Sequence, residues 1–188
     1  MEDRNDIRRK KNMIQYCKRC CLPSTKPHLS FDEEGICNAC RNYENRKNVD
    51  WDERKKELME ILDRYRSKDG SNWDCIIPVS GGKDSTYQVI TMLELGMNPL
   101  CVTATTCDLT DIGRRNIENI KKMGVDYIEV TTNRVVRAKL NRIGLTEVGD
   151  ISWPEHVSIF TVPVRMAVNF NVPLIIWGEN SQNEYGGP

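Results

Sequence analysis

The chain has 188 residues, of which 39% are hydrophobic and 29% charged, a composition typical of a globular protein with one α/β core. Its 27 Lys and Arg residues balance its 27 Asp and Glu residues, whereas proteins that coat nucleic acid carry a clear basic excess. No apolar run approaches the roughly 18 residues of a membrane span, and the charged N-terminus lacks the apolar segment of a secretory signal. We therefore expect a cytoplasmic protein with no nucleic-acid and no membrane partner.

The first expected region, residues 1–49, is a polar arm followed by a cysteine-rich stretch with little periodicity. It contains two C-x2-C pairs separated by 16 residues, which is the spacing of a four-cysteine zinc site. Two such turns complete a tetrahedron that leaves no open position for water, so the predicted Zn2+ is structural. Unliganded thiols and an iron–sulfur cluster are the alternatives. The predicted ligands are Cys17, Cys20, Cys37 and Cys40.

The other four cysteines lie outside this pattern. Cys21 is adjacent to a predicted ligand and is either a spare thiol or an alternative ligand. Cys75 and Cys101 fall within predicted strands, and Cys107 follows the end of one. Small residues at such positions are usually buried, so we expect packing rather than catalysis from these three.

Residues 50–72 are expected to form a connecting helix and its terminating turn. Asp50 and Glu53 have the spacing of a capping box, and apolar residues from Trp51 to Tyr65 follow at helical intervals. The polar stretch SKDGSN at 67–72 ends this helix and indicates a domain boundary.

From residue 73 to 188, strand and helix patterns alternate and indicate a second domain. Single helices between strands imply a parallel sheet with right-handed crossovers. In the helix expected over 111–123, we predict that one face carries Ile112, Ile117, Ile120 and Met123. The expected strands are 75–79, 100–106, 127–132 and 172–177, and the expected helices are 83–95, 111–123, 134–142 and 155–169.

A glycine-rich turn, PVSGGKDST, lies between the first of these strands and the following helix. Two consecutive glycines allow positive φ and close approach of a ligand, and the helix start favours phosphate. Lys83 adds positive charge, and Asp84 can hold a magnesium ion that bridges phosphate oxygens. Ser80 and Ser85 add hydroxyl donors.

This turn is not one of the two familiar nucleotide motifs. A Walker A loop is excluded because Ile77 stands at the position of its first glycine and Asp84 follows the lysine, and G-x-G-x-x-G is absent. The alternative interpretation is an ordinary strand-to-helix turn that binds no ligand.

In this setting SGGKDS resembles the pyrophosphate loop of the PP-loop ATP pyrophosphatases, whose fold is of the adenine nucleotide alpha hydrolase-like type. The resemblance implies a doubly wound parallel sheet that binds ATP at the carboxyl ends of its strands. It also implies cleavage of ATP between the α and β phosphates, with transfer of AMP and release of pyrophosphate.

Two further segments resemble one branch of that superfamily, the N-acetyl sugar amidotransferases of lipopolysaccharide and nonulosonic-acid pathways. They are YCKRCCLPSTKPHLSFDEEGICNACRNYENR and VPLIIWGENSQNEYGG. The resemblance implies that the acetamido oxygen of an N-acetylated sugar nucleotide or sugar acid is adenylated and replaced by ammonia, which gives an acetamidino group. It also implies glutaminase and synthase-like partner subunits, and the absence of a glutaminase signature in the chain is consistent with them. The resemblance further implies a domain that continues beyond Pro188.

The resemblance further implies roles for individual residues. The expected phosphate cradle is Ser80, Gly81, Gly82, Lys83 and Ser85, with Asp84 holding Mg2+. Expected near adenine or ribose are Thr103, Ala104 and Thr105, and expected near the α-phosphate or a second metal are Gly178, Glu179, Asn180 and Glu184. The expected catalytic residues are Lys83, Asp84, Glu179 and Asn180. His156 is either a substrate contact or a structural hydrogen-bonding residue.

Two rival functions are compatible with parts of the pattern. A PP-loop tRNA thiolase would need a basic face and a catalytic cysteine pair, for which Cys101 and Cys107 are the nearby candidates, and the zero net charge speaks against it. A zinc-stabilised ATP-binding module without chemistry is the second rival.

Overall fold

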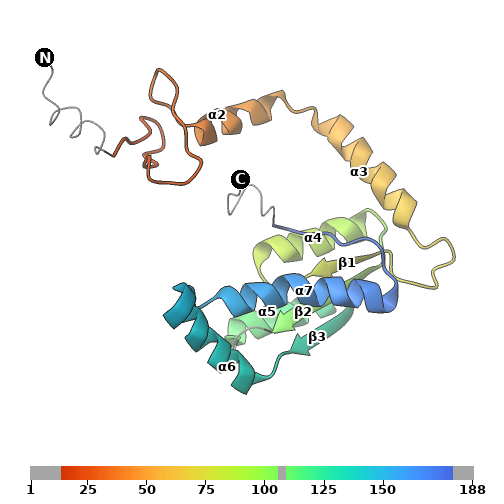
Figure 1. The fold of residues 1–188 in the computed structure, drawn as a ribbon. Coiled ribbons are helices and arrows are strands. Elements are labelled where there is room, and N and C mark those ends of the chain that lie inside the picture. The colour runs from red at the N-terminus through yellow and green to blue at the C-terminus, as the bar shows by residue number, and fades with distance from the viewer. Residues whose placement is uncertain (1–13, 106–108, 180–188) are drawn as a thin grey trace, which may run out of the picture. The chain divides into compact units, whose positions relative to one another are not determined.

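The computed structural model describes residues 14–105 and 109–179 (Figure 1). These residues belong to two compact units, one reaching to Lys55 and the other running from Lys56. Among the described helices, none is both long and apolar enough to cross a bilayer.

The first unit has few buried side chains. Helix α2 (Asn38–Asn45) and the short 3-10 helix η1 (Arg46–Asn48) follow two turns, which are closed by the bridges Tyr16–Pro23 and Phe31–Cys37. The carboxylate of Asp32 accepts the N–H groups of Glu34 and Ile36 and so fixes the second turn. A unit with so small an apolar interior needs a further source of stability, and the sequence predicts a structural metal site for that role.

Helix α3 (Trp51–Tyr65) begins where the sequence predicts. The Asp50 side chain caps it by accepting the N–H groups of Asp52 and Glu53 at 3.1 and 3.0 Å. Further along this helix, beyond Lys56, Leu62 is fully buried in the core of the second unit.

The second unit is built on a parallel sheet in the order β1-β2-β3, which confirms three of the expected strands. The strands are β1 (Cys75–Pro78), β2 (Pro99–Thr105) and β3 (Asp126–Thr131). The helices are α4 (Lys83–Glu94), α5 (Asp111–Lys121), α6 (Arg134–Ile143) and α7 (Trp153–Phe170), with the π-helical turn η2 (Gly144–Val148) between the last two.

The fourth expected strand, residues 172–177, is not a regular strand. It forms a single parallel bridge between Ile175 and Ile76, so it lies beside β1 on the side away from β2. Two hydrogen bonds of 2.9 Å join it to Ile76, from the Ile76 N–H to the Leu174 carbonyl and from the Ile176 N–H to the Ile76 carbonyl.

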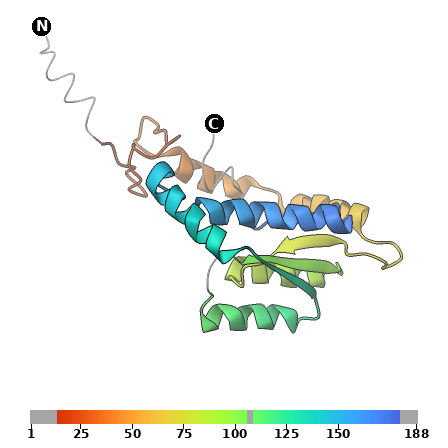
Figure 2. The same ribbon diagram turned by 60° about the horizontal axis from the view of Figure 1, so that its bottom comes forward.

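Helices cover both faces of the sheet, and Figure 2 shows α7 on one side with α4 and α5 on the other. The apolar layer on one face of the sheet contains Leu62, Cys75, Ile77, Val79, Val89, Met92, Met97, Cys101 and Ile120. The apolar layer on the opposite face contains Ile76, Leu100, Val102, Val162, Ala167 and Val172. Successive strand residues therefore alternate between two apolar layers, and the doubly wound fold is confirmed.

Two expectations about core residues have different outcomes. Cys75 and Cys101 are fully buried core residues as predicted, whereas Cys107 lies outside the described residues. Ile112 is 63% exposed, so its placement on the buried face with Ile117 was wrong. An α-helix turns about 100° per residue, so positions five apart differ by about 140° and cannot share a narrow face.

Candidate functional site

The glycine-rich turn joins the end of β1 to the start of α4. Gly81 has a φ of +78°, in the left-handed region that favours glycine. A Cβ atom there would lie 3.2 Å from Ile117 Cγ1 and 3.3 Å from the Gly113 carbonyl oxygen, both in α5. The backbone of the turn is thus pressed against α5, and Gly82 follows as the N-cap of α4.

Two serines brace this turn from within. The Ser85 hydroxyl donates to the Gly82 carbonyl at 3.2 Å and accepts the Ser80 N–H at 3.4 Å. The Gly82 N–H points to the Ser80 hydroxyl at 3.4 Å, and Thr86 also donates to the Gly82 carbonyl. Ser85 is buried, so in this structure it shapes the turn.

Lys83 and Asp84 form the exposed first turn of α4. Their side chains are 88% and 77% exposed, and they pair with each other at 2.7 Å between Nζ and Oδ1. An ion pair this exposed contributes little free energy, so either group can exchange its partner for a ligand. The helix start adds N–H groups that have no partner within the helix, which suits a phosphate.

Side chains near the carboxyl end of β2 point to alternate faces. Thr103 is buried, and its hydroxyl donates to the Val79 carbonyl and accepts the Tyr127 hydroxyl at 2.7 Å. The Thr103 side chain therefore fixes the residue that precedes the glycine turn. Ala104 packs instead within the apolar layer beneath α7.

Thr105 belongs to a charged network at the last position of β2. Its hydroxyl donates to Glu129 Oε1 at 2.5 Å, and Arg114 donates to both carboxylate oxygens at 2.9 and 3.0 Å. The Thr105 hydrogen bond, followed by the Arg114 guanidinium, lowers the pKa of Glu129. This network ties α5 to the ends of β2 and β3.

The segment after residue 177 passes α4. A Cβ atom on Gly178 would lie 2.9 Å from Gln88 Oε1, which places this glycine against α4. Glu179 is exposed, and Asn180 and Glu184 lie outside the described residues. Because β1 has β2 on one side and residues 172–177 on the other, the strand order reverses here. Open α/β sheets usually bind their ligands at such a point.

A pocket that the sequence did not predict lies at the ends of β2 and β3 against α6. Its volume is about 560 Å3. Six of the residues that line it are Thr105, Thr131, Thr132, Arg134, Arg137 and Arg142. The available signal was the series of arginines directly after the third strand. His156, by contrast, is exposed in the first turn of α7.

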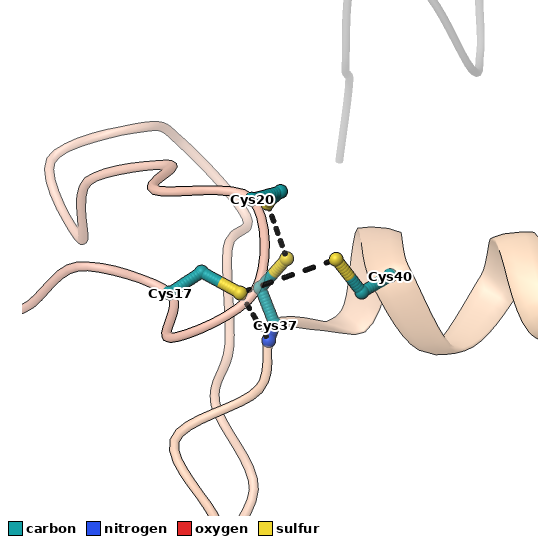
Figure 3. Close-up of side chains that lie close together, drawn as sticks. All are labelled: Cys17, Cys20, Cys37 and Cys40. Atoms are coloured by element: carbon teal, nitrogen blue, oxygen red, sulfur yellow. Dashed lines mark hydrogen bonds between the residues drawn. The ribbon is translucent and has the colours of Figure 1, made fainter.

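The four predicted zinc ligands converge, as Figure 3 shows. All four sulfur atoms lie within 4.8 Å of one another, with Cys20 and Cys37 3.5 Å apart and Cys17 and Cys40 4.0 Å apart. Four sulfurs at about 2.3 Å from one zinc ion would have separations of about 3.8 Å, which these distances bracket. The donor set fits a tetrahedral thiophilic metal, and Cys21 is not among these four.

The backbone around the cluster favours a thiolate at one position. Burial alone would raise the pKa of Cys17, but N–H groups of Cys20, Cys37 and Arg19 point at its sulfur, and the pKa falls to about 6. Burial and the neighbouring thiols raise the pKa of Cys40 to about 12. A bound cation would offset the repulsion among four thiolates at this cluster.

Comparisons with known proteins bear on the fold. No protein-family model matches the chain. An uncharacterized protein of Methanocaldococcus jannaschii is 31% identical over 108 residues, which are 56% of this chain and 38% of that protein. The NH3-dependent NAD synthetase of Campylobacter jejuni has a TM-score of 0.53 at 13% identity over 72% of this chain and 59% of its own. NMN synthetase of Francisella tularensis has a TM-score of 0.51 at 14% identity over 69% of this chain and 55% of its own.

These matches confirm the α/β fold that the PP-loop resemblance implies. The chain spans 38% of the curated relative and between 55% and 59% of the two solved structures.

Proposed function

We propose that this chain binds ATP and adenylates an amide oxygen, as the ATP-using part of an N-acetyl sugar amidotransferase. The supporting observation is the glycine turn, which is braced by Ser80 and Ser85 and opens α4 at the point where the strand order reverses. The two solved structures reported above are both named as synthetases, and one is described as NH3-dependent. That description agrees with ammonia as the incoming nucleophile.

In this proposal the β and γ phosphates lie on the turn. Backbone N–H groups at the start of α4 and the Lys83 ammonium group neutralise their charge. Gly81 and Gly82 let the phosphates approach the backbone because no Cβ atom intervenes. Asp84, which is exposed beside Lys83, would hold Mg2+, which screens the phosphate oxygens and the departing pyrophosphate.

The chemistry then requires the acceptor amide beside the α-phosphate. An amide carbon resists ammonia because its oxygen is a poor leaving group. Attack of that oxygen on the α-phosphorus forms the O–P bond and breaks the bond to pyrophosphate. Ammonia then adds to the activated carbon, AMP leaves with the oxygen, and loss of a proton gives the acetamidino group. We propose that Glu179 and Asn180 order this region.

Two further roles complete the proposal. The Cys17, Cys20, Cys37 and Cys40 cluster would hold a structural Zn2+, which has no open position for chemistry. The ammonia would come from separate glutaminase and synthase-like subunits, and the acceptor would be an N-acetylated sugar nucleotide or sugar acid. We place the reaction in the cytoplasm, in the synthesis of surface polysaccharide.

The test is ATP turnover in the Lys83→Ala/Asp84→Ala double variant. We expect release of pyrophosphate with an N-acetylated sugar nucleotide and ammonia to fall at least 100-fold, because both charged phosphate contacts are removed. The matched control is Glu118→Ala/Lys121→Ala, which deletes another surface ion pair of 2.7 Å. Unchanged pyrophosphate release in the first variant would contradict the proposal.

Product analysis separates the rivals. Mass spectrometry of the sugar should show loss of oxygen and gain of NH. A thiolated tRNA with an unmodified sugar would instead support a thiolase. Against that alternative, Cys101 is fully buried, and burial raises its pKa to about 12, so it is not a ready thiolate. ATP binding without pyrophosphate release would indicate the module that lacks chemistry.

A further inference from the structure

The pocket at the ends of β2 and β3 has the composition of an anion site. Its volume of about 560 Å3 is in the range of small-molecule pockets. Three of the ten residues that line it are arginines, and none of those ten is Asp or Glu. The rest of its polar lining includes the side chains of Thr105, Thr131 and Thr132. Guanidinium groups bind carboxylates and phosphates with two parallel hydrogen bonds, which makes arginine the usual residue for such groups.

One arginine of the pocket is held rigidly. Arg137 is only 9% exposed, and one of its terminal nitrogens donates to Thr132 Oγ1 at 2.8 Å and to Ser158 Oγ at 2.7 Å. These hydroxyls come from the end of β3 and from α7, so the guanidinium is oriented from two sides. The orientation of the guanidinium is therefore set before an anion enters, so binding would cost little side-chain entropy.

Arg134 and Arg142 complete the basic lining from the two ends of α6. Both are exposed, so a substitution at either position leaves the core undisturbed. Arg134 stands at the first position of that helix and Arg142 in its last turn. The pocket is therefore open to solvent at its rim and charged at its buried wall.

We propose that this pocket anchors the anionic group of the acceptor, a phosphate or a carboxylate carried by the N-acetylated sugar. This inference rests on the proposed function and names the class of acceptor as an anionic sugar. The pocket and the glycine turn both lie at the carboxyl ends of adjacent parallel strands. Neighbouring strands are about 4.8 Å apart, so the pocket is about one to two strand spacings from the turn. A sugar held by its anionic group could then present its acetamido oxygen toward the turn.

The experiment uses a pair of probes that differ in the anion alone. N-acetylglucosamine 1-phosphate and neutral N-acetylglucosamine are titrated into the 188-residue chain by calorimetry, without ATP. We expect the phosphorylated sugar to bind at least tenfold more tightly. A third arm with N-acetylneuraminate distinguishes a carboxylate from a phosphate as the preferred anion.

The variants locate the binding. Arg134→Gln and Arg142→Gln each remove one charge from an exposed position and should weaken binding of the preferred anionic sugar at least fivefold. Arg137→Lys keeps the charge but loses the planar fork, and it should weaken binding as well. The matched control is Arg165→Gln, an exposed arginine of α7 that is not among the lining residues, and it should have no effect. Thermal unfolding shows whether each variant remains folded.

The outcomes separate this proposal from the proposed function. Equal binding of the charged and neutral sugars, or equal weakening by Arg165→Gln, would overturn the anion pocket. One-for-one displacement of the sugar phosphate by ATP would also overturn it, because the pocket would then belong to the nucleotide. If sugar binding depends on these arginines but the chain releases no pyrophosphate, the anion pocket is supported and the proposed adenylation is refuted.

Discussion

Gly81 combines two constraints that can be measured separately. Its φ of +78° strains any other residue, and a Cβ atom would also meet Ile117 and the Gly113 carbonyl. We expect Gly81→Ala to lower the free energy of unfolding by about 2–4 kcal/mol, the sum of backbone strain and overpacking. Urea unfolding measures the loss.

The control for this substitution is Gly70→Ala. Gly70 has a similar φ of +68°, but no atom lies within 4 Å of the position a Cβ would take. Only backbone strain then destabilises the variant, and we expect its free energy of unfolding to fall by about 1 kcal/mol. Equal losses in the two variants would show that contact with α5 contributes nothing to the shape of the glycine turn.

Glu129 makes the network at the end of β2 sensitive to pH. Its hydrogen bond from Thr105 and its pair with Arg114 hold its pKa below the ordinary value of 4.5. A carboxylate whose pKa is lowered on folding stabilises the protein above that ordinary value, and this stability is lost as pH falls through the folded pKa. We expect Glu129→Gln to cost about 1 kcal/mol at pH 7 and progressively less below pH 4.5.

Unfolding curves of wild type and variant across pH 3–7 provide the measurement. Glu118→Gln is the comparison, because Glu118 is 56% exposed and pairs with Lys121 on the surface. Its substitution should change stability by a few tenths of a kcal/mol at any pH. A Glu129 variant whose deficit stays constant down to pH 3 would contradict the charged network.

At the scale of elements, strong local signals were sufficient for most of the second unit. β1 to β3 and the helices α4 to α7 begin or end within a few residues of their predicted limits. Helix starts were predictable because capping is local, as at Asp50. Strands β1 and β2 are short apolar runs bounded by turn residues, the usual pattern of buried parallel strands.

The sequence was less informative where long-range geometry decides. Residues 172–177 are apolar like the other strands, yet they pair with β1 through a single bridge. The π-helical turn η2, which follows α6, has no local pattern that we recognised. Helical spacing separates Ile112 from Ile117 by about 140°, but only packing against the sheet shows which of the two is buried.

The candidate site also has parts that local sequence predicts and parts that depend on the folded chain. The cysteine cluster and the glycine turn were predictable because each is a compact motif in the sequence. The inward orientation of Thr103 depends on its strand register with β1 and β3, and no local pattern reports that register. The arginine-lined pocket draws its residues from β2, β3 and α6, so it exists only in the folded chain.

At the scale of the whole molecule, the two units have separate sources of stability. The second has apolar layers on both faces of its sheet, whereas the first has few buried side chains beside its four-cysteine cluster. We expect Cys37→Ser to reduce bound zinc from one ion per chain to well below half. It should also remove hydrogen-exchange protection from residues 14–48 and leave residues 56–179 protected, because metal binding there supplies the free energy of folding.

Metal analysis and hydrogen-exchange mass spectrometry are the measurements. The control is Cys21→Ser, the adjacent thiol that does not belong to the cluster, and it should retain the metal. Full protection of residues 14–48 in the Cys37 variant would show that the first unit folds without a metal.

The bridge between Ile76 and Ile175 joins parts of the chain about a hundred residues apart, and Asn72 reaches the Phe170 carbonyl across a similar separation. Closing so large a loop is slow because its entropy is lost before the contact forms. During synthesis on the ribosome, β1 therefore waits with one edge unpaired until residues 172–177 emerge from the exit tunnel. Over that interval the unpaired edge exposes backbone N–H and C=O groups that could pair with a strand of another chain.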